Sequence, residues 1–391
     1  MNLITPRKFL LPLIKEELID YPTPLSLNYL WGFGSLSGVS LVIQIITGIL
    51  LAMHYTPHTE YAFSSVERIM RDINFGWLLR YLHANGASFF FLTVYLHIAR
   101  GLYYFSFASP KQYLWLTGVI IYILMIGTAF LGYVLPWGQM SFWAATVITN
   151  IITALPFGDG GESFAIWLWG GFSVDNPTLN RFFSLHYLFP FLIFVLMIVH
   201  LFFLHQSGSS DPCLHAKQVD VIRFYPYFVV KDIFGLLIFF LGLAYFVFFA
   251  PNFLGHPDNY VEANPLVTPK HIVPEWYFLP FYGMLRSIPN KFAGIAVMFS
   301  ALIFLLVLPF FVSISNSRLF GFSYGLLLYS SISLYRKLVL FFIANFILLG
   351  WIGGQAVSTI VLFLGGLCTF LYFVFFFLVF MLFVFDKYKF K

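Results

Sequence analysis

Charge and cysteine are scarce in this chain. Charged residues make up only 9% of its 391 residues, and its two cysteines are Cys213 and Cys368. So few charges exclude an ordinary water-soluble globule. Two cysteines so far apart exclude a disulfide framework, a Cys-x-x-Cys-His haem attachment and an iron–sulfur cluster. The first 20 residues also lack the continuous apolar run of a cleavable presequence, so we expect the first apolar segment to direct membrane insertion.

Apolar residues are correspondingly abundant, at 60% of the chain, with 52 phenylalanines. Runs long enough to cross ~30 Å of hydrocarbon predict eight transmembrane helices. They cover residues 31–53, 77–104, 114–135, 182–204, 228–249, 292–312, 338–353 and 357–385. A ninth apolar stretch, 319–334, contains Ser and Gly and lies between two arginines, so a surface helix or loop is an equal alternative there.

Eight spans place both termini on one side of the membrane. Fourteen of the 21 basic residues fall on that side. By the positive-inside rule the termini face the cytoplasm or the matrix of an organelle. The formal charge of +5 is therefore interpreted as an orientation signal and not as a nucleic-acid-binding patch.

Four histidines form two pairs with the same spacing: His83 and His97 in the second span, and His186 and His200 in the fourth. Fourteen residues is close to four helical turns, so both members of a pair lie on one face, about 21 Å apart. Two such helices facing each other would make two stacked bis-histidine sites. A two-ligand site in an apolar bundle suits a macrocycle that supplies the other ligands itself, which predicts haem.

Glycines and arginines support this prediction. The glycine pairs Gly34 and Gly48, and Gly118 and Gly132, repeat the interval of fourteen in the first and third spans. They would leave room for a macrocycle edge, although small residues also serve ordinary helix packing in membranes. Near the histidines lie three arginines that could pair with haem propionates, Arg80, Arg100 and Arg181. The alternative for each arginine is contact with lipid headgroups.

Several sequence motifs resemble cytochrome b of the respiratory quinol–cytochrome c reductase. They are His83-Ala84-Asn85-Gly86-Ala87, Gly132-Tyr133-Val134-Leu135-Pro136-Trp137-Gly138-Gln139-Met140-Ser141, Pro274-Glu275-Trp276-Tyr277, Arg286-Ser287-Ile288-Pro289 and Trp351-Ile352-Gly353-Gly354-Gln355. The resemblance covers most of the chain, roughly 20–312 and again from Trp351. It implies an all-α integral membrane protein in which residues 1–210 form a four-helix bundle with two stacked, non-covalent b haems, and residues 211–391 complete the quinol site.

In this family the haem ligands pair across the second and fourth spans, which implies His83 with His186 and His97 with His200. The family also implies a quinol oxidation site on the outer side, with Glu275 as proton acceptor and Tyr133 and Tyr282 as aromatic neighbours. The implied quinone reduction site on the inner side would contain a second set of residues: His205, Ser209, Lys231 and Asp232. An acid and an imidazole together suit proton delivery to a reduced quinone.

The resemblance further implies partners and a location. The substrates would be ubiquinol and ubiquinone, and the partners an iron–sulfur subunit of the Rieske type, a subunit of the cytochrome c type, other subunits of the complex and membrane lipids. The complex would be a homodimer that binds no nucleic acid. The expected location is the mitochondrial inner membrane with both termini in the matrix, and the alternative is a bacterial plasma membrane.

Alternative functions remain at this point. The plastid quinol–plastocyanin relative divides the protein after the fourth span and spaces its second histidine pair by fifteen, unlike this chain. Another bis-haem membrane quinone reductase would lack the Pro274–Tyr277 motif and the glycine pairs. A proton-coupled transporter could also carry buried histidines. A visible spectrum with reduced b-type bands would distinguish the transporter from the others.

This chain departs from the family pattern in three places. Gly32 stands where a polar residue is common near the inner site, and the segment between Pro309 and Trp351 is longer than usual. Ala144 replaces a glycine next to the motif that ends at Ser141. Its added methyl group is expected to narrow the outer quinol pocket, which makes Ala144 a predicted binding determinant.

We therefore expect Ala144 to weaken binding of a rigid inhibitor such as a methoxyacrylate. Overpacking costs ~1–3 kcal/mol, which corresponds to roughly 5- to 150-fold in affinity. The measurement is inhibition of quinol oxidation in the native enzyme and in Ala144→Gly, with an inner-site inhibitor as the control. Equal sensitivity of the two enzymes to the methoxyacrylate would show that residue 144 does not line the pocket.

Overall fold

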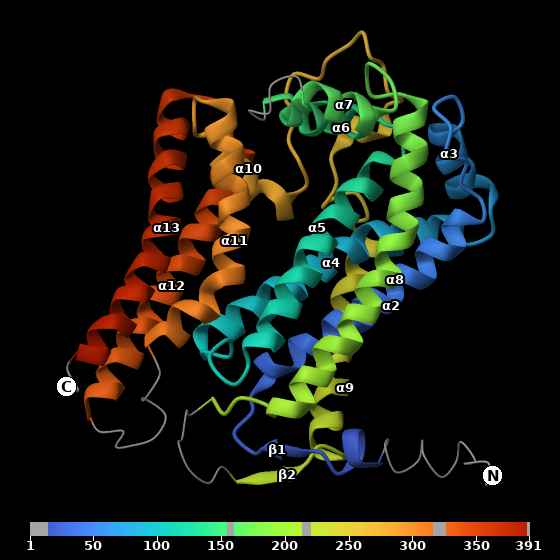
Figure 1. Cartoon of the computed structure of the whole chain (residues 1–391). Helices are drawn as coiled ribbons and strands as arrows, with labels where there is room; N and C mark the ends of the chain where they lie inside the picture. The colour runs from blue at the N-terminus through green and yellow to red at the C-terminus, as the bar shows by residue number, and fades with distance from the viewer. Residues whose placement is uncertain (1–14, 155–159, 213–219, 316–325, 389–391) are drawn as a thin grey trace, which may run out of the picture.

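The computed structural model describes residues 15–154, 160–212, 220–315 and 326–388 (Figure 1). The long helices are α2 (Phe33–Ala52), α4 (Gly76–Tyr103), α5 (Gln112–Val134), α8 (Asn176–Ser207), α9 (Tyr227–Phe248), α11 (Lys291–Ser315), α12 (Leu326–Gly354) and α13 (Thr359–Tyr388). The shorter helices are α3 (Ala62–Asp72), α6 (Gln139–Ile151), α7 (Gly160–Trp169) and α10 (Leu279–Arg286). Single turns are η1 (Lys15–Ile19), η2 (Tyr29–Gly32), η3 (Ile152–Ala154), η4 (Pro257–Tyr260) and η5 (Trp276–Phe278), and the strands are β1 (Pro22–Pro24) and β2 (Val221–Arg223).

Each of the eight predicted spans is a helix, so the all-α membrane fold is confirmed. Within the described residues, seven helices are long and apolar enough to cross a membrane by composition. The eighth, α4, has 28 residues and packs along α2, but its hydropathy is lower because it carries Arg80, Arg100 and two histidines. The least apolar span thus carries two of the four candidate haem ligands and two of the candidate arginines.

The seventh span differs from its prediction. The helix α12 begins at Leu326 and not near residue 338. The described part of the 319–334 stretch therefore belongs to this helix and forms no separate surface segment, while residues 316–325 lie outside the described part. Three serines, Ser330, Ser331 and Ser333, lower the hydropathy of the first turns of α12.

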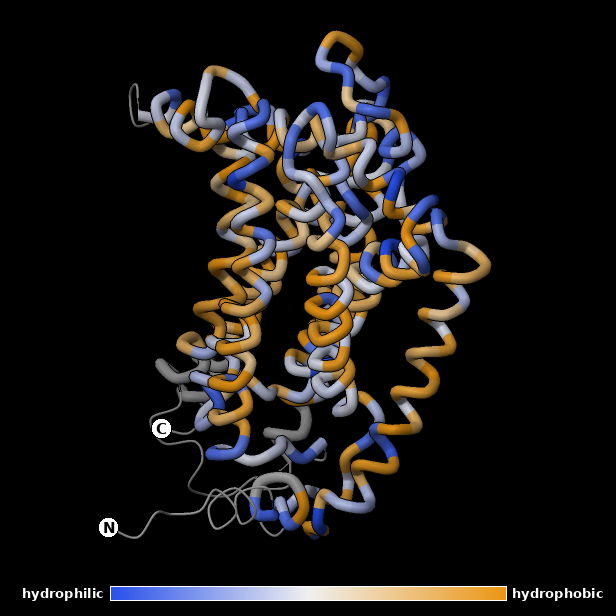
Figure 2. The backbone as a smooth tube through the Cα atoms, turned by 90° about the vertical axis from the view of Figure 1, so that its right-hand side faces the viewer, coloured by the Kyte–Doolittle hydropathy of each residue, from blue (hydrophilic) through white to orange (hydrophobic). Residues whose placement is uncertain are grey.

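Hydrophobic residues dominate the middle of the long helices, and hydrophilic residues gather toward the two ends (Figure 2). The helices α6 and α7 lie across one end, whereas η1, the strands and the last turns of α13 lie at the other (Figure 1). The first described element, η1, and the last turns of the last helix, α13, thus lie at the same end, as eight spans require. The helix α9 packs on α2 and α4, while α10 to α13 pack with one another.

Local sequence sets the ends of the helices around the outer site. The helix α5 ends at Val134, two residues before Pro136, which has no backbone N–H to continue the hydrogen bonds of a helix. Trp137 then adopts a left-handed backbone with φ of 54° and is buried. Its carbonyl accepts a hydrogen bond from Ala263 N at 3.0 Å, which ties the segment after α9 to the start of α6. At the start of α8, the Thr178 hydroxyl accepts a hydrogen bond from Asp175 N at 3.2 Å.

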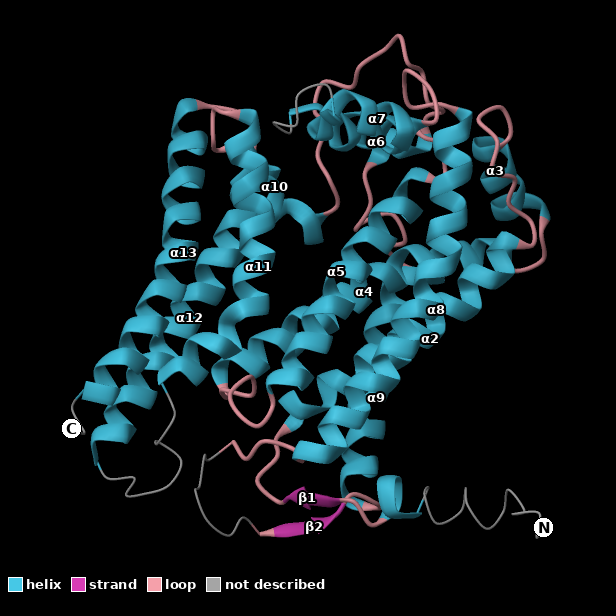
Figure 3. Ribbon diagram, viewed as in Figure 1, coloured by secondary structure: helices cyan, strands magenta, loops and turns pink. Residues whose placement is uncertain are grey.

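The small sheet organises the opposite end (Figure 3). Strands β1 and β2 pair antiparallel, with Thr23 opposite Ile222. Prolines occupy both ends of β1, a position that suits an edge strand because proline donates no hydrogen bond. The sheet holds the segment before α2 against the start of α9, which brings Asp232 near Gly32.

Glycines bring α10 and α12 into close backbone contact. A Cβ on Gly353 would lie within 2.2 Å of the carbonyl oxygen of Leu279, and one on Gly283 within 2.8 Å of the carbonyl oxygen of Leu349. Both positions need glycine, because a backbone carbonyl cannot move aside as a flexible side chain can. The contact holds α10, and with it the preceding Glu275 segment, against the C-terminal helices.

Gly353→Ala should therefore push α10 away from α12 and destabilise the protein by ~1–3 kcal/mol, the usual cost of overpacking. The measurement is the thermal unfolding midpoint of the purified, detergent-solubilised protein. Gly366→Ala is the matched control, because a Cβ on Gly366 of α13 would meet nothing within 4 Å. Equal midpoints for the two variants would contradict the proposed contact.

Candidate haem and quinone sites

The four histidines meet in the two predicted pairs. The imidazole ring centres of His83 and His186 lie 6.2 Å apart, and those of His97 and His200 lie 6.3 Å apart. In each pair one ring comes from α4 and the other from α8. A metal held at ~2 Å from one nitrogen of each ring would separate the two ring centres by about 6 Å. The spacing of both pairs therefore fits one ion between two imidazoles.

Glycines on the flanking helices make room for these rings. A Cβ on Gly48 would lie 3.2 Å from Cε1 of His83, and one on Gly34 would lie 3.1 Å from Cε1 of His97. On α5, Gly118 faces His200 in the same way and Gly132 faces His186. The sequence prediction assigned these glycines to the edge of a macrocycle. In the structure they lie directly against the histidine rings, which fixes the distances from α2 to α4 and from α5 to α8.

Every one of the four Nδ1 atoms has a hydrogen-bond partner. Thr47 Oγ1 lies 2.9 Å from Nδ1 of His83, and Thr117 Oγ1 lies 3.0 Å from Nδ1 of His200. Nδ1 of His186 lies 2.8 Å from the carbonyl oxygen of Thr128. When Nδ1 donates its proton to such an oxygen, the lone pair of Nε2 is free to bind a metal.

Sequence reasoning missed Thr47 and Thr117. Each directly precedes a glycine that faces a histidine, so the repeated Thr-Gly pair was the available signal. The fourth ring, His97, instead has Arg100 as its partner, with Nη2 3.1 Å from Nδ1. An arginine only donates, so this nitrogen accepts a hydrogen bond here.

Buried donors without a partner gather near the His97 pair. Within the described residues, Nε1 of Trp31, Nε of Arg100 and Oγ of Ser106 are buried and have no hydrogen-bond partner. The guanidinium of Arg100 also lies over the Trp31 ring, 5.0 Å from its centre. Unpaired buried donors are costly. Their chemistry suits the carboxylates of a haem, and a ligand with acceptor oxygens would satisfy them.

The other two arginines occupy different surroundings. Arg80 lines a cavity next to His83. Arg181 is exposed and donates to the backbone carbonyls of Trp167 and Leu168 at the end of α7. The structure therefore brings Arg80 and Arg100 to the histidine pairs and uses Arg181 to join α7 to α8.

A cavity of about 270 Å³ joins the outer histidine pair to the Glu275 segment. Its walls include His83, His186, Arg80, Tyr133 and Glu275. The carboxyl of Glu275 lies outside the spanning helices, and burial raises its pKa to about 7. A carboxyl with such a pKa exchanges a proton near neutral pH, as a general base requires.

Two other predicted outer-site residues lie outside the walls of this cavity. The hydroxyl of Tyr282 donates to the carbonyl oxygen of Ile272 at 3.3 Å, and the Arg286 guanidinium lies over its ring. Ala144 is buried on α6. The structure brings Tyr133 and Glu275 together in the cavity wall, whereas Tyr282 and Ala144 lie outside that wall.

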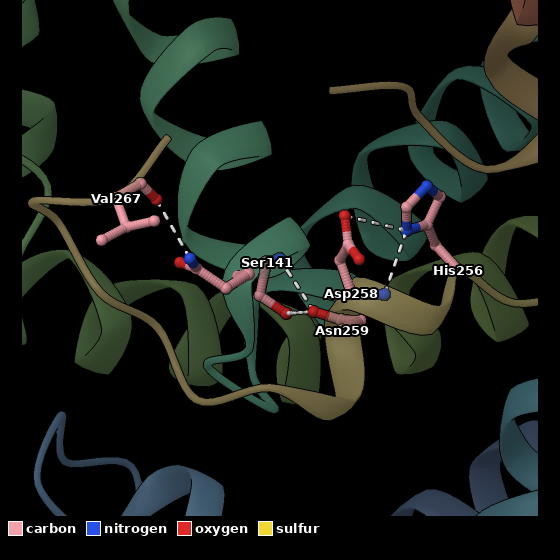
Figure 4. A network of polar contacts seen from close by, with 6 residues as sticks. Ser141, His256, Asp258, Asn259 and Val267 are labelled. Carbon is pink, nitrogen blue, oxygen red and sulfur yellow. Dashed lines mark hydrogen bonds and ion pairs between the residues drawn. The ribbon is translucent and has the colours of Figure 1, made fainter. Parts of the chain in front are cut away.

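A polar network holds the outer loop in place (Figure 4). Asn259 Oδ1 accepts hydrogen bonds from the backbone and the hydroxyl of Ser141, both at 2.9 Å. His256 and Asn259 line the same cavity as Glu275. Nδ1 of His256 accepts a hydrogen bond from Asp258 N at 3.3 Å and lies 4.0 Å from the Asp258 carboxylate. Sequence reasoning missed His256, because its role depends on a cavity wall formed from distant segments.

The predicted inner residues gather at the end of the molecule that carries the sheet. A Cβ on Gly32 would lie 3.2 Å from the Asp232 carboxylate, so the glycine leaves room for this side chain. The His205 ring stacks on Tyr21 with ring centres 4.6 Å apart. Lys231 Nζ donates to the carbonyl oxygen of Leu27 at 2.6 Å. These contacts join α8, α9 and the segment before α2.

Ser209 lies in the turn after α8. Lys111 Nζ donates to its two neighbours, the carbonyl oxygen of Gly208 at 2.6 Å and the hydroxyl of Ser210 at 2.7 Å. Within the described residues, no cluster of three or more His, Cys, Asp or Glu side chains could hold a metal ion. Cys213 lies outside these residues, and Cys368 is buried on α13. The two histidine pairs are thus metal sites only for an ion that brings ligands of its own.

Known proteins share both the sequence and the fold. The family model described as cytochrome b/b6/petB matches residues 18–208, and that of the C-terminal part, cytochrome b/b6/petD, matches residues 262–373. Cytochrome b of Chondrus crispus is 54% identical over 94% of this chain and 93% of its own length. Cytochrome b of Rickettsia prowazekii is 57% identical over 86% of this chain and 82% of its own length.

A solved structure agrees with these matches. It is described as a hyperthermophilic respiratory Complex III, and it aligns with a TM-score of 0.88 and 32% identity over 99% of both chains. With histidine pairs, flanking glycines and an outer carboxylate all in place, the chain belongs to the cytochrome b family.

Proposed function

We propose that this protein is the membrane electron-transfer subunit of a quinol–cytochrome c reductase. It oxidises ubiquinol at the outer site and reduces ubiquinone at the inner site, and two b haems connect the sites. The observation that carries the proposal is the pair of bis-histidine sites, 6.2 and 6.3 Å between ring centres, stacked between a buried carboxyl at one end and an acid with an imidazole at the other.

The histidine pairs would hold the haems as axial ligands, His83 with His186 and His97 with His200. The bound haems supply one-electron redox chemistry across the membrane. The protein orients each imidazole through its Nδ1 partner and supplies polar groups for the propionates. For the inner haem these groups are the unpaired donors of Trp31, Arg100 and Ser106, and for the outer haem the group is Arg80.

At the outer site Glu275 acts as the proton acceptor for ubiquinol. Its carboxyl lies in the wall of the cavity beside Tyr133, and its pKa of about 7 lets it take a proton near neutral pH. His256 lines the same cavity and lies next to Asp258, whose side chain is 49% exposed. These two groups offer the proton a route from the cavity to water.

At the inner site Asp232 and His205 deliver protons to the reduced quinone. The Lys231 ammonium, which donates to the carbonyl oxygen of Leu27, is the neighbour that feeds protons to them. Ser209, in the turn after α8, is the neighbour that donates a hydrogen bond to the quinone. The supporting observation is that α8, α9 and the segment before α2 meet here around Asp232 and His205. The separation of this site from Glu275 by the two histidine pairs is what couples proton movement to electron transfer.

Membership of the cytochrome b family argues against the transporter alternative. The chain also matches both the N-terminal and the C-terminal family model in one polypeptide, which argues against the divided plastid arrangement. We further propose the Rieske-type and cytochrome c-type subunits as partners within a dimeric complex. Relatives in plants and algae support the mitochondrial inner membrane, and the Rickettsia relative supports the plasma membrane as the alternative.

His97→Ala should remove the inner haem and leave the outer one. The variant loses one axial ligand, whereas His83 and His186 keep their glycine and hydrogen-bond contacts. The measurement is haem stoichiometry with a redox titration of the purified complex. His54→Ala is the control, since His54 belongs to neither pair. Two bound haems in His97→Ala would overturn the ligand assignment.

Glu275→Gln should slow quinol oxidation by about 100-fold or more, since a general base contributes roughly 10²- to 10⁴-fold, and should leave the haem spectra normal. In the native protein the base form of Glu275 increases as pH rises through about 7, so the rate should rise over that range. The variant should lose this limb of the pH profile. Glu262→Gln, at an exposed carboxylate of the same loop, is the control. An unchanged profile in Glu275→Gln would assign the proton to another group.

A further inference from the structure

The segment that carries Glu275 is fastened to one face of α4. Three successive contacts join Trp276 and Tyr277 to Ser88, Phe91 and Tyr95 of the helix. Trp276 Nε1 donates to Ser88 Oγ at 3.1 Å. The Tyr277 ring stacks on Phe91 with ring centres 4.0 Å apart and planes 4° from parallel. The Tyr95 hydroxyl donates to the backbone carbonyl of Tyr277.

Helical geometry separates these contacts from the histidines. Ser88, Phe91 and Tyr95 follow the i, i+3, i+7 spacing of one helix face. At 3.6 residues per turn they form a stripe about 60° wide, and His83 and His97 lie more than about 100° around the axis from its centre. The same rigid helix thus holds two haem ligands on one side and the outer carboxyl segment on another.

Burial makes the Tyr95 hydroxyl a firm anchor. Tyr122 on α5 donates to it at 3.3 Å, so the two hydroxyls and the Tyr277 carbonyl form a chain. Tyr122 and Tyr277 are 2% and 5% exposed, so no water competes for these bonds. A buried carbonyl that loses its donor is left unpaired, and the segment would then have to shift to find a partner.

Such a shift of the segment would move the Glu275 backbone and its carboxyl. Its own carbonyl accepts a hydrogen bond from Phe278 N at 2.8 Å, which closes the η5 turn over the two anchored residues. The turn, the Trp276 contact and the Tyr277 contacts leave the Glu275 backbone little freedom. Its carboxyl is therefore placed in the cavity wall by contacts made two residues further along the chain.

We propose that Tyr95 is a positioning residue for quinol oxidation, which through the Tyr277 carbonyl holds Glu275 at its place in the outer cavity. The proposal rests on the proposed function, since it assigns to Tyr95 the orientation of the carboxyl that accepts the quinol proton. Tyr95 itself is not among the residues that line the outer cavity.

The test is Tyr95→Phe in the intact complex. The variant keeps the ring and removes the hydroxyl. We expect kcat of quinol oxidation to fall about tenfold through misplacement of the carboxyl. A looser segment exposes Glu275 to water, so the midpoint of the acid limb should move below its native value near pH 7. Haem spectra and quinone reduction at the inner site should stay native.

Tyr335→Phe is the matched control. This tyrosine is 5% exposed and donates to the carbonyl oxygen of Leu102 at 2.7 Å, near the C-terminal end of α4 and not at the Glu275 segment. It should keep the native rate and pH profile. A native rate and profile in Tyr95→Phe, or the same change in both variants, would overturn the proposal.

Ser88→Ala tests the same segment independently, since it removes the acceptor of Trp276 Nε1. The midpoint of the acid limb of the pH–rate profile should move to lower pH in Ser88→Ala, as in Tyr95→Phe. If Tyr95→Phe fails to assemble, a native pH–rate profile in Ser88→Ala would overturn the proposal. Glu275→Gln distinguishes a failure of the proton-acceptor role of Glu275 from a failure of the positioning role of Tyr95. If it keeps the native pH profile, the proposed role of the carboxyl fails. If it loses the limb while Tyr95→Phe leaves the limb in place, only the positioning role fails.

Discussion

The close fit of each imidazole against a glycine is the constraint on which the rest of the structure depends. A glycine of α2 or α5 lies against every one of the four histidine rings, and a single added Cβ would meet the ring near 3 Å or closer. This fit sets the distance between α2 and α4 and between α5 and α8. With those distances fixed, the rings face each other in pairs at a spacing suited to one metal ion.

Polar groups inside the bundle explain the uneven hydropathy of the spans. A ring in an apolar interior needs partners for its nitrogens, and the threonine hydroxyls, a carbonyl and Arg100 supply them at Nδ1. The helix α4 carries Arg80, Arg100 and two of the histidines, and it is the least apolar of the long helices in the described part of the chain. Intramembrane polar residues are thus concentrated where the chemistry is proposed.

The outer cavity shows how distant segments share one rigid support. The helix α4 bears His83 on one side and anchors the Glu275 segment on another, while α10 is held to α12 by glycine contacts. The proposed proton acceptor and a proposed haem ligand are therefore placed relative to each other by a single helix. Because a helix is stiff along its hydrogen-bonded backbone, the carboxyl cannot drift from the histidine pair without breaking buried contacts.

The sequence by itself determined the membrane class and eight apolar spans, two of which carry a histidine pair on one face, because long apolar runs and a fixed fourteen-residue interval are local, periodic signals. Which histidines face each other across the two helices was implied only by the family resemblance, and the structure brings those pairs together. It did not locate the start of α12, because serines lower the hydropathy of the first turns of this helix. It missed Thr47, Thr117 and His256, whose roles depend on which side chain of another helix lies opposite. The contact of Tyr95 with the Glu275 segment joins residues 182 positions apart, so only the tertiary structure could decide it. The sequence determines the spacing of side chains along one helix, whereas the distances between helices depend on the packing of the whole bundle.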